Sequence, residues 1–299
     1  MFTRISYFCC LLLLSHTAFS KERPMGTIDR PVIMAMVPGQ DSIVLKSQGE
    51  IIQKCLEQET KLIFKLIIPT NFVAIVEAFG TKRVDLSLMN TYGYILAHQK
   101  FKATARLIGT YKNKSEYWGQ IIARSDGPQS IAELNGKTFA FVDPASTSGY
   151  VLPAKLIEDE KIKLKSTVFA GKHDFVVTMV YQGRVDAGAT YHTLPDNGVP
   201  QDARTLVQTQ FPDVLEKVKI LKVIGPIPSD PIVFGAHMSK VIQDKIVKGF
   251  ITCSKKPTVQ DAFMKTYHLD GVLQVSDDRW NDFRQTLKAI GKNPEELLK

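Results

Sequence analysis

The sequence lacks the motifs by which most metal-dependent and cofactor-dependent enzymes are recognised. It has no His-x-x-x-His, Cys-x-x-Cys or glutamate-rich metal spacing, no Walker or dinucleotide fingerprint, and no Gly-x-Ser-x-Gly nucleophile elbow. No run of lysine and arginine exceeds three residues, although the formal net charge is +8. We therefore expect no cofactor, no metal and no nucleic-acid partner, and a basic surface that mildly attracts anions.

Long hydrophobic runs are also missing, because no stretch approaches the roughly 20 apolar residues that span a bilayer. Residues 1–20 contain one charge, at Arg4, then a short apolar run at 7–14, and then small residues at Ala18 and Ser20. This is the pattern of a secretory signal peptide, and the run is too short for a membrane anchor. We predict cleavage after Ser20 and a soluble, periplasmic protein.

Cysteine is scarce, and only Cys55 and Cys253 remain beyond the predicted signal segment. An oxidising compartment permits a disulfide between them. Sequence spacing does not show whether they lie close enough, so the sequence leaves this bond open.

Short apolar segments alternate along the chain with segments that have helical spacing of apolar residues. In the first part we expect strands at 33–37, 62–68, 84–89 and 105–110, and helices at 46–57, 72–79 and 94–100. The pattern restarts with strands at 120–123, 138–142, 167–169 and 187–189 and helices at 130–134, 150–158 and 175–182, and helical stretches at 240–254 and 278–290 follow.

This alternation predicts an α/β protein with largely parallel sheets and two lobes. We expect residues 21–119 and 223–299 to form lobe 1, and residues 120–222 to form lobe 2, inserted into lobe 1. Proteins of this kind bind ligands in the crevice at the carboxyl ends of their strands.

Residues 143–149 (Asp-Pro-Ala-Ser-Thr-Ser-Gly) stand between an expected strand and an expected helix. The first N–H groups of a helix have no internal acceptor, and the helix dipole adds partial positive charge there. Ser146, Thr147 and Ser148 add hydroxyl donors, and Gly149 lets a ligand approach the backbone. One hydroxyl would explain an ordinary helix cap, whereas three followed by glycine favour an anion site.

A second turn, at residues 169–174, contains Lys172 and His173. His173 could donate a hydrogen bond to an oxyanion and Lys172 could add charge. The alternative is a surface turn in which Asp174 caps the next helix. A serine with His173 and Asp174 or Asp186 also supplies the residue types of a hydrolase triad. We rank an exported serine hydrolase last, because adjacent His173 and Asp174 point in different directions.

Taken together, these segments resemble the phosphate/phosphite/phosphonate substrate-binding proteins of ABC transporters. Residues 143–150 are similar to the family's most specific motif, residues 169–174 to its second and residues 183–188 to its third. Residues 226–231 resemble its return crossover, and residues 85–97 its first-lobe ligand loop. The resemblance implies a type II periplasmic-binding-protein fold, with two hinge-linked lobes that close on a small phosphorus oxyanion.

The resemblance also implies roles for individual residues. Ser146, Thr147, Ser148 and His173 would hold the ligand oxygens, beside the backbone at Gly149. Tyr94 would close the site from lobe 1, and Asp230 would face the distal part of the ligand, for example an amino group. The implied partner of a monomeric chain is the permease of an ABC transporter. The alternative is a sensor that docks on a receptor or histidine kinase.

The chain departs from the family pattern at three places. Asn90-Thr91 stands where a Gly-Pro pair is usual, Asn71-Phe72 replaces a common tyrosine, and Lys172 replaces a small residue. The anion half of the site is intact and the lobe-1 half is altered. These departures leave the particular ligand open, and Lys172 would either favour a more highly charged anion or face solvent.

Overall fold

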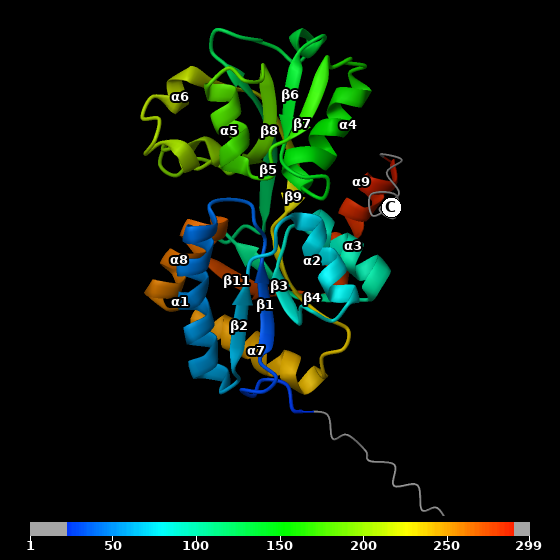
Figure 1. Cartoon of the computed structure of the whole chain (residues 1–299), viewed down its shortest axis with the longest axis vertical. Helices are drawn as coiled ribbons and strands as arrows, with labels where there is room; N and C mark the ends of the chain where they lie inside the picture. Colours follow the sequence, from blue (N-terminus) through cyan, green and yellow to red (C-terminus); the bar gives the residue numbers. More distant parts are fainter. Residues whose placement is uncertain (1–22, 290–299) are drawn as a thin grey trace, which may run out of the picture.

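The computed structural model of the chain describes residues 23–289, so the predicted signal segment at 1–20 lies outside the described residues. Within residues 23–289 the strands form two sheets, of six and of five strands. Figure 1 shows them one above the other with helices on their faces. We name the six-stranded sheet with its helices lobe one, and the five-stranded sheet with its helices lobe two.

Lobe one has the strand order β11-β4-β10-β3-β1-β2. Its strands are β1 (Val32–Met36), β2 (Phe64–Ile67), β3 (Leu86–Leu88), β4 (Thr104–Thr110), β10 (Pro231–Phe234) and β11 (Gly271–Gln274). Its helices are α1 (Ser42–Thr60), α2 (Phe72–Gly80), α3 (Thr91–Phe101), α7 (Lys240–Cys253), α8 (Pro257–Tyr267), the short η4 (Asp277–Trp280) and α9 (Asn281–Ala289).

Lobe two has the strand order β7-β6-β8-β5-β9. Its strands are β5 (Glu116–Arg124), β6 (Thr138–Phe141), β7 (Ser166–Phe169), β8 (Ala187–His192) and β9 (Val218–Pro228). Its helical segments are η1 (Ala132–Leu134), η2 (Thr147–Val151), α4 (Leu152–Asp159), α5 (His173–Tyr181), η3 (Ala203–Val207) and α6 (Val214–Lys217).

The predicted two-lobed α/β fold is confirmed, but the prediction of largely parallel sheets is wrong. In lobe one, β1 pairs in parallel with β2 and β3, whereas β10 is antiparallel to both β3 and β4. In lobe two, β5 is antiparallel to β8 and β9. The reason is the insertion, because the strands that leave one lobe and return to it run in opposite directions.

The two lobes are joined by β5 and β9, which pair along almost their whole length (Figure 1). The predicted lobe boundaries, at 119/120 and 222/223, fall inside these strands.

Cys55 and Cys253 form the disulfide that the sequence left open, with their Cα atoms 6.0 Å apart. The bond joins α1 to α7. Around it lies a core of fully buried apolar residues that includes Ile52, Leu56 and Phe250. In the described part of the chain, no helix is long and apolar enough to cross a membrane.

Candidate functional site

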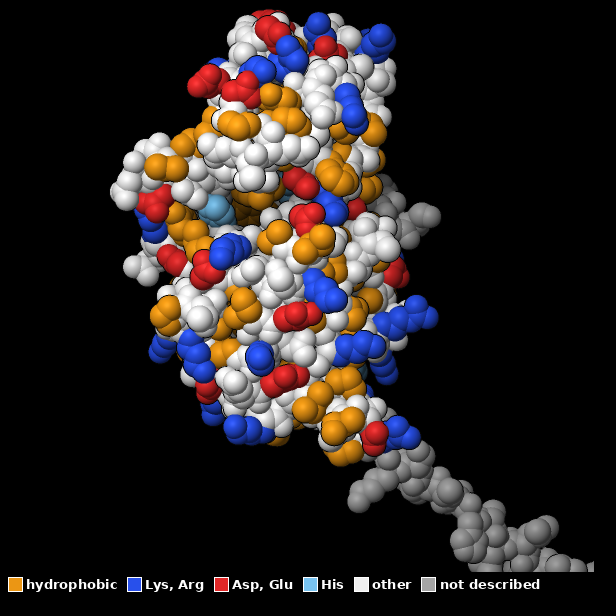
Figure 2. Space-filling view, turned by 60° about the vertical axis from the view of Figure 1, so that its left-hand side comes forward, with side chains coloured by type: hydrophobic (Ala, Val, Ile, Leu, Met, Phe, Trp, Pro, Cys, Tyr) orange, Lys and Arg blue, Asp and Glu red, His pale blue; other side chains and the backbone are white. Residues whose placement is uncertain are grey.

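A cavity of about 110 Å³ lies between the two lobes. Figure 2 shows the surface hollowed at the seam between the upper and lower parts, with apolar side chains inside. Lobe one and the connections between the lobes contribute Val37, Gly39, Gln40, Phe72, Asn90, Tyr111, Ser229, Asp230 and residues 264–269. Lobe two contributes Glu116, Tyr117, Ser146, Ser148, His173, Tyr191, Thr193 and Leu206.

The segment predicted to bind an anion forms one wall of this cavity. A π-helical turn at η2 continues directly into α4, so one helix runs from Thr147 to Asp159 with its N-terminus at the cavity. Ser146 caps it by accepting a hydrogen bond from the backbone N–H of Gly149 at 3.1 Å. Ser146 and Ser148 both line the cavity and are buried. Their hydroxyls and the free N–H groups of the first helical turn form a donor cluster suited to an anion.

Thr147 and Gly149 belong to the same motif but do not line the cavity. The Thr147 hydroxyl points to lobe one, where it accepts from the backbone N–H of Tyr92 at 2.9 Å and donates to Oδ1 of Asn90 at 3.0 Å. Gly149 packs against Val142, since a Cβ atom there would lie 2.4 Å from Val142 Cγ2. Thr147 therefore contacts lobe one rather than the cavity, and Gly149 permits close packing against Val142.

His173 begins α5 and lines the cavity, as predicted. Its Nδ1 lies 2.7 Å from the hydroxyl oxygen of Thr190, and its ring meets the edge of Tyr191 at 5.0 Å. Burial lowers the pKa of His173 to about 3, so the imidazole is neutral at neutral pH. If Thr190 donates to Nδ1, the ring proton sits on Nε2, which can then donate to a ligand oxygen.

Asp230 also lines the cavity, on the side of lobe one. Its side chain has no hydrogen bond or ion pair with any residue between 23 and 289, and burial raises its pKa to about 7. The neighbouring carboxylate of Glu116 is paired at 3.2 Å with Arg279 instead. Among residues 23–289, Asp230 is thus a carboxyl group at the cavity without a partner, and it can bind a hydrogen-bond donor or a cation.

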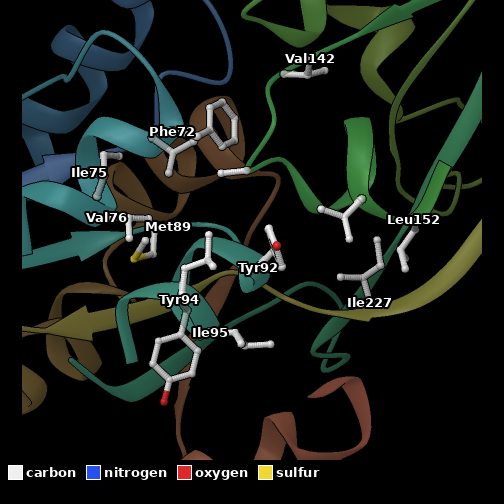
Figure 3. Packing of buried hydrophobic residues seen from close by; sticks show 14 of the residues in the cluster. Phe72, Ile75, Val76, Met89, Tyr92, Tyr94, Ile95, Val142, Leu152 and Ile227 are labelled. Carbon is white, nitrogen blue, oxygen red and sulfur yellow. The ribbon is translucent and has the colours of Figure 1, made fainter. Parts of the chain in front are cut away.

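Tyr94 was expected to close the site, and the structure places it elsewhere. Its ring extends from α3 away from Val142 and Leu152 (Figure 3). The hydroxyl donates to Asp277, and the ring packs edge-on against Trp280 at 4.8 Å. Helix α3 begins at Thr91, so Tyr94 lies within the helix and its hydroxyl reaches Asp277, while the N-cap residue Asn90 lines the cavity.

Asn90 takes the place at the cavity that was assigned to Tyr94. Sequence reasoning noted Asn90 only as a departure from a family pattern, although asparagine before a helix is a standard capping signal that fixes where α3 begins. Residues 264–269, at the end of α8, were also missed. The signal was Pro257 followed by apolar residues at helical spacing, which would have predicted α8.

The lobes also contact each other beside the cavity. Oδ2 of Asp143 accepts from the backbone N–H of Phe72 at 3.3 Å, and the backbone N–H of His173 donates to the carbonyl oxygen of Gly39 at 3.0 Å. Lys172 does not line the cavity, and its ammonium lies 3.4 Å from the hydroxyl of Ser42 on α1. These contacts across the seam describe a closed arrangement of the two lobes.

The described residues include no group of three or more His, Cys, Asp or Glu side chains that could hold a metal ion.

A family model described as "ABC transporter, phosphonate, periplasmic substrate-binding protein" matches residues 34–280. Among curated proteins, the phosphate-import protein of Mycolicibacterium smegmatis is 26% identical over 206 residues. That alignment covers 62% of this chain and 64% of the relative, so the chain spans somewhat less than two thirds of its length.

Solved structures share the fold at low sequence identity. A binding protein component of an ABC phosphonate transporter from Pseudomonas aeruginosa aligns with a TM-score of 0.76 at 17% identity, covering 92% of this chain and 97% of the other. A Prochlorococcus marinus protein in complex with methylphosphonate aligns with a TM-score of 0.74 at 15% identity, covering 88% and 98%. Both alignments extend over the two lobes.

Proposed function

The chain belongs to the periplasmic substrate-binding proteins of phosphonate ABC transporters, and we propose that it captures a phosphonate, phosphite or phosphate ion between its lobes and delivers it to a membrane permease. The family consists of transport proteins that bind a solute, so an exported serine hydrolase is rejected. Cleavage after Ser20, the monomeric state and the permease itself are parts of this proposal. The relatives that bind phosphate and methylphosphonate support its substrate class.

The observation that carries the proposal is a helix N-terminus that meets Ser146, Ser148 and His173 in a cavity between lobes. Lys265 is the lysine that lines this cavity, and its ammonium is paired at 2.6 Å with Asp261. An anion would thus be held by neutral O–H and N–H donors and by the helix dipole rather than by a free cation. Small oxyanions with several acceptor oxygens suit such a donor cluster best.

The protonation state of Asp230 determines which ligand groups it would contact. A neutral carboxyl group donates to a ligand oxygen, whereas an ionised one attracts an ammonium group. We propose that Asp230 faces the distal part of the ligand, which can carry an amino group. Tyr111 and Tyr267 line the same cavity, and their rings would enclose a short alkyl chain.

Capture would proceed by a hinge movement. In an open form, lobe two presents Ser146, Ser148 and His173 to solvent, and the anion binds there first. Rotation about the ribbon of β5 and β9 then brings Asn90 and Asp230 of lobe one over the ligand. The contacts between Asp143 and α2 form in the closed state, and this closed surface would be the one recognised by the permease.

The proposal is tested by calorimetry on the purified exported protein. Phosphate, phosphite, methylphosphonate, 2-aminoethylphosphonate and sulfate are titrated separately, and thermal unfolding is recorded with each. At 100 times its dissociation constant, a ligand should stabilise the protein by about 2.7 kcal/mol. We expect at least one phosphorus anion to do so, and sulfate to do so much less.

His173→Ala should remove most of this stabilisation, because it deletes a donor at the anion. His192→Ala is the matched control, since His192 lies in lobe two outside the cavity and bonds to Gln120 at 3.0 Å. Absence of stabilisation by every phosphorus anion would refute the proposed function. Equal stabilisation of wild type and His173→Ala would refute the placement of the anion.

A further inference from the structure

The orientation of the Asn90 side chain is fixed by two hydrogen bonds. Its Oδ1 accepts from the backbone N–H of Gly93 at 2.9 Å and from the hydroxyl of Thr147 at 3.0 Å. A backbone N–H can only donate, so the amide atom that faces Gly93 is the oxygen. The Nδ2 group, with its two N–H bonds, is therefore the free end of the side chain.

Asn90 is only 6% exposed and lines the cavity. Between residues 23 and 289, Nδ2 makes no hydrogen bond, although Oδ1 accepts two. Nδ2 is not among the fully buried side-chain atoms that lack a partner, so it retains some exposure, and a donor at a cavity can be satisfied by water or by a ligand. A ligand oxygen in the cavity would satisfy it.

Thr147 holds Asn90 in this orientation from the opposite lobe. A hydroxyl has one proton, and that of Thr147 is given to Oδ1 of Asn90 while its oxygen accepts from the N–H of Tyr92. Thr147 consequently has no proton left for an anion. The donor that the motif loses at Thr147 is replaced by the amide of Asn90, from lobe one.

We propose that Asn90 is a direct ligand-binding residue, whose Nδ2 donates to an oxyanion oxygen from lobe one, and that Thr147 is the positioning residue that aims it. This inference rests on the proposed function and adds a specificity-determining donor to it. The Asn90–Thr147 bond exists only when the lobes meet, so it couples contact with the ligand to closure. Asn90 stands where the resemblance leads one to expect glycine, so the contact belongs to this chain.

The test uses three variants of the exported protein and measures the dissociation constants of phosphate, phosphite and methylphosphonate. Asn90→Asp keeps an oxygen for Gly93 and Thr147 and remains a good helix cap, but it replaces the donor with a negative charge. Asn90→Ser also caps the helix and removes the donor without adding charge. We expect binding to weaken about 100-fold or more in Asn90→Asp and about 10-fold in Asn90→Ser.

Thr147→Val separates positioning from simple packing. If Thr147 acts through Asn90, Thr147→Val should weaken binding about 5-fold more in the wild-type background than in Asn90→Ser, where only its bond to the N–H of Tyr92 remains to be lost. Additive effects would refute the positioning role, and wild-type affinity in Asn90→Ser would refute the whole inference. Circular dichroism and unfolding midpoints without ligand, close to those of wild type, verify that each variant folds.

The outcome also distinguishes this inference from the proposed function. Should wild type bind no phosphorus anion, the proposed function fails and this inference fails with it. Should wild type bind, His173→Ala weaken binding and both Asn90 variants bind normally, only this inference fails.

Discussion

Replacing Asp230 by asparagine should change how the stability of the ligand-free protein depends on pH. Burial raises the pKa of this carboxyl from 3.8 to about 7. In the unfolded chain the group loses its proton near the lower value, whereas in the folded protein it keeps the proton up to the higher one. Between these pH values the folded state binds more protons, so the free energy of unfolding falls as pH rises, until it levels off above pH 7.

The size of the change in the free energy of unfolding follows from the pKa shift of Asp230. A difference of about 3 pH units, at 1.36 kcal/mol per unit, corresponds to about 4 kcal/mol, of which roughly 2.3 kcal/mol is lost between pH 5 and pH 7. Asparagine does not titrate. The free energy of unfolding of Asp230→Asn minus that of wild type should therefore increase by about 1.4 kcal/mol per pH unit up to pH 7, and then stay constant.

The assay is urea unfolding of both proteins at pH 5, 6, 7 and 8. His173 contributes with the opposite sign, because burial lowers its pKa to about 3 and stability is lost as pH falls below the unfolded value of 6.5. That contribution is present in both proteins and cancels in the difference. A difference that stays flat from pH 5 to pH 8 would refute the argument that Asp230 is buried as a neutral acid.

The pH dependence of ligand affinity provides a second test of the ionisation of Asp230. If the ammonium of 2-aminoethylphosphonate pairs with Asp230, binding must ionise the carboxyl, so affinity should rise up to about 10-fold per pH unit between pH 5 and pH 7. Methylphosphonate is the control, since it carries the same phosphonate group and has no amine. Equal pH profiles for the two ligands would contradict a cation-binding role for Asp230.

Three further changes have defined outcomes. Replacing Cys55 and Cys253 by serine should lower the free energy of unfolding by about 2–5 kcal/mol in urea titrations, because the bond closes a long loop; unchanged stability would contradict this. Gly149→Ala should destabilise by about 1–3 kcal/mol through its clash with Val142, seen as a lower melting temperature. Tyr94→Phe should leave anion affinity within about twofold of wild type, since it only removes a hydrogen bond outside the cavity; a large loss would restore Tyr94 to the site.

The fold class was predictable because its signals are local. Apolar periodicity and the breaks at Pro38-Gly39, Pro69 and Gly80 mark where strands and helices end, and the structure follows them closely. Strand direction was not predictable in this way. Whether β10 runs with or against β3 depends on the path of the chain through the other lobe, which no local pattern records.

The candidate site was predicted in part, for a similar reason. Ser146, Ser148 and His173 were found because they begin helices, where sequence patterns are strongest. Tyr94 was misplaced because the helix was expected to begin at residue 94, whereas α3 begins at Thr91, so that Asn90 rather than Tyr94 stands at the start of the helix. The pairing of Thr147 with Asn90 joins residues 57 positions apart, so only the packing of the lobes reveals it.

We expect the motif at residues 143–149 to link ligand binding to closure, because its side chains point in two directions. Ser146 and Ser148 face the cavity, whereas Asp143 and Thr147 reach across to the N-termini of α2 and α3. Observed affinity equals the affinity of the closed form reduced by the fraction of molecules that can close. A substitution on either side of the motif therefore changes apparent affinity, but only those facing the cavity should also change which anion is preferred. Phe72 and Asn90, in the two departures of lobe one, stand at the helix starts that the motif contacts and also line the cavity, so we expect substitutions there to change both closure and anion preference.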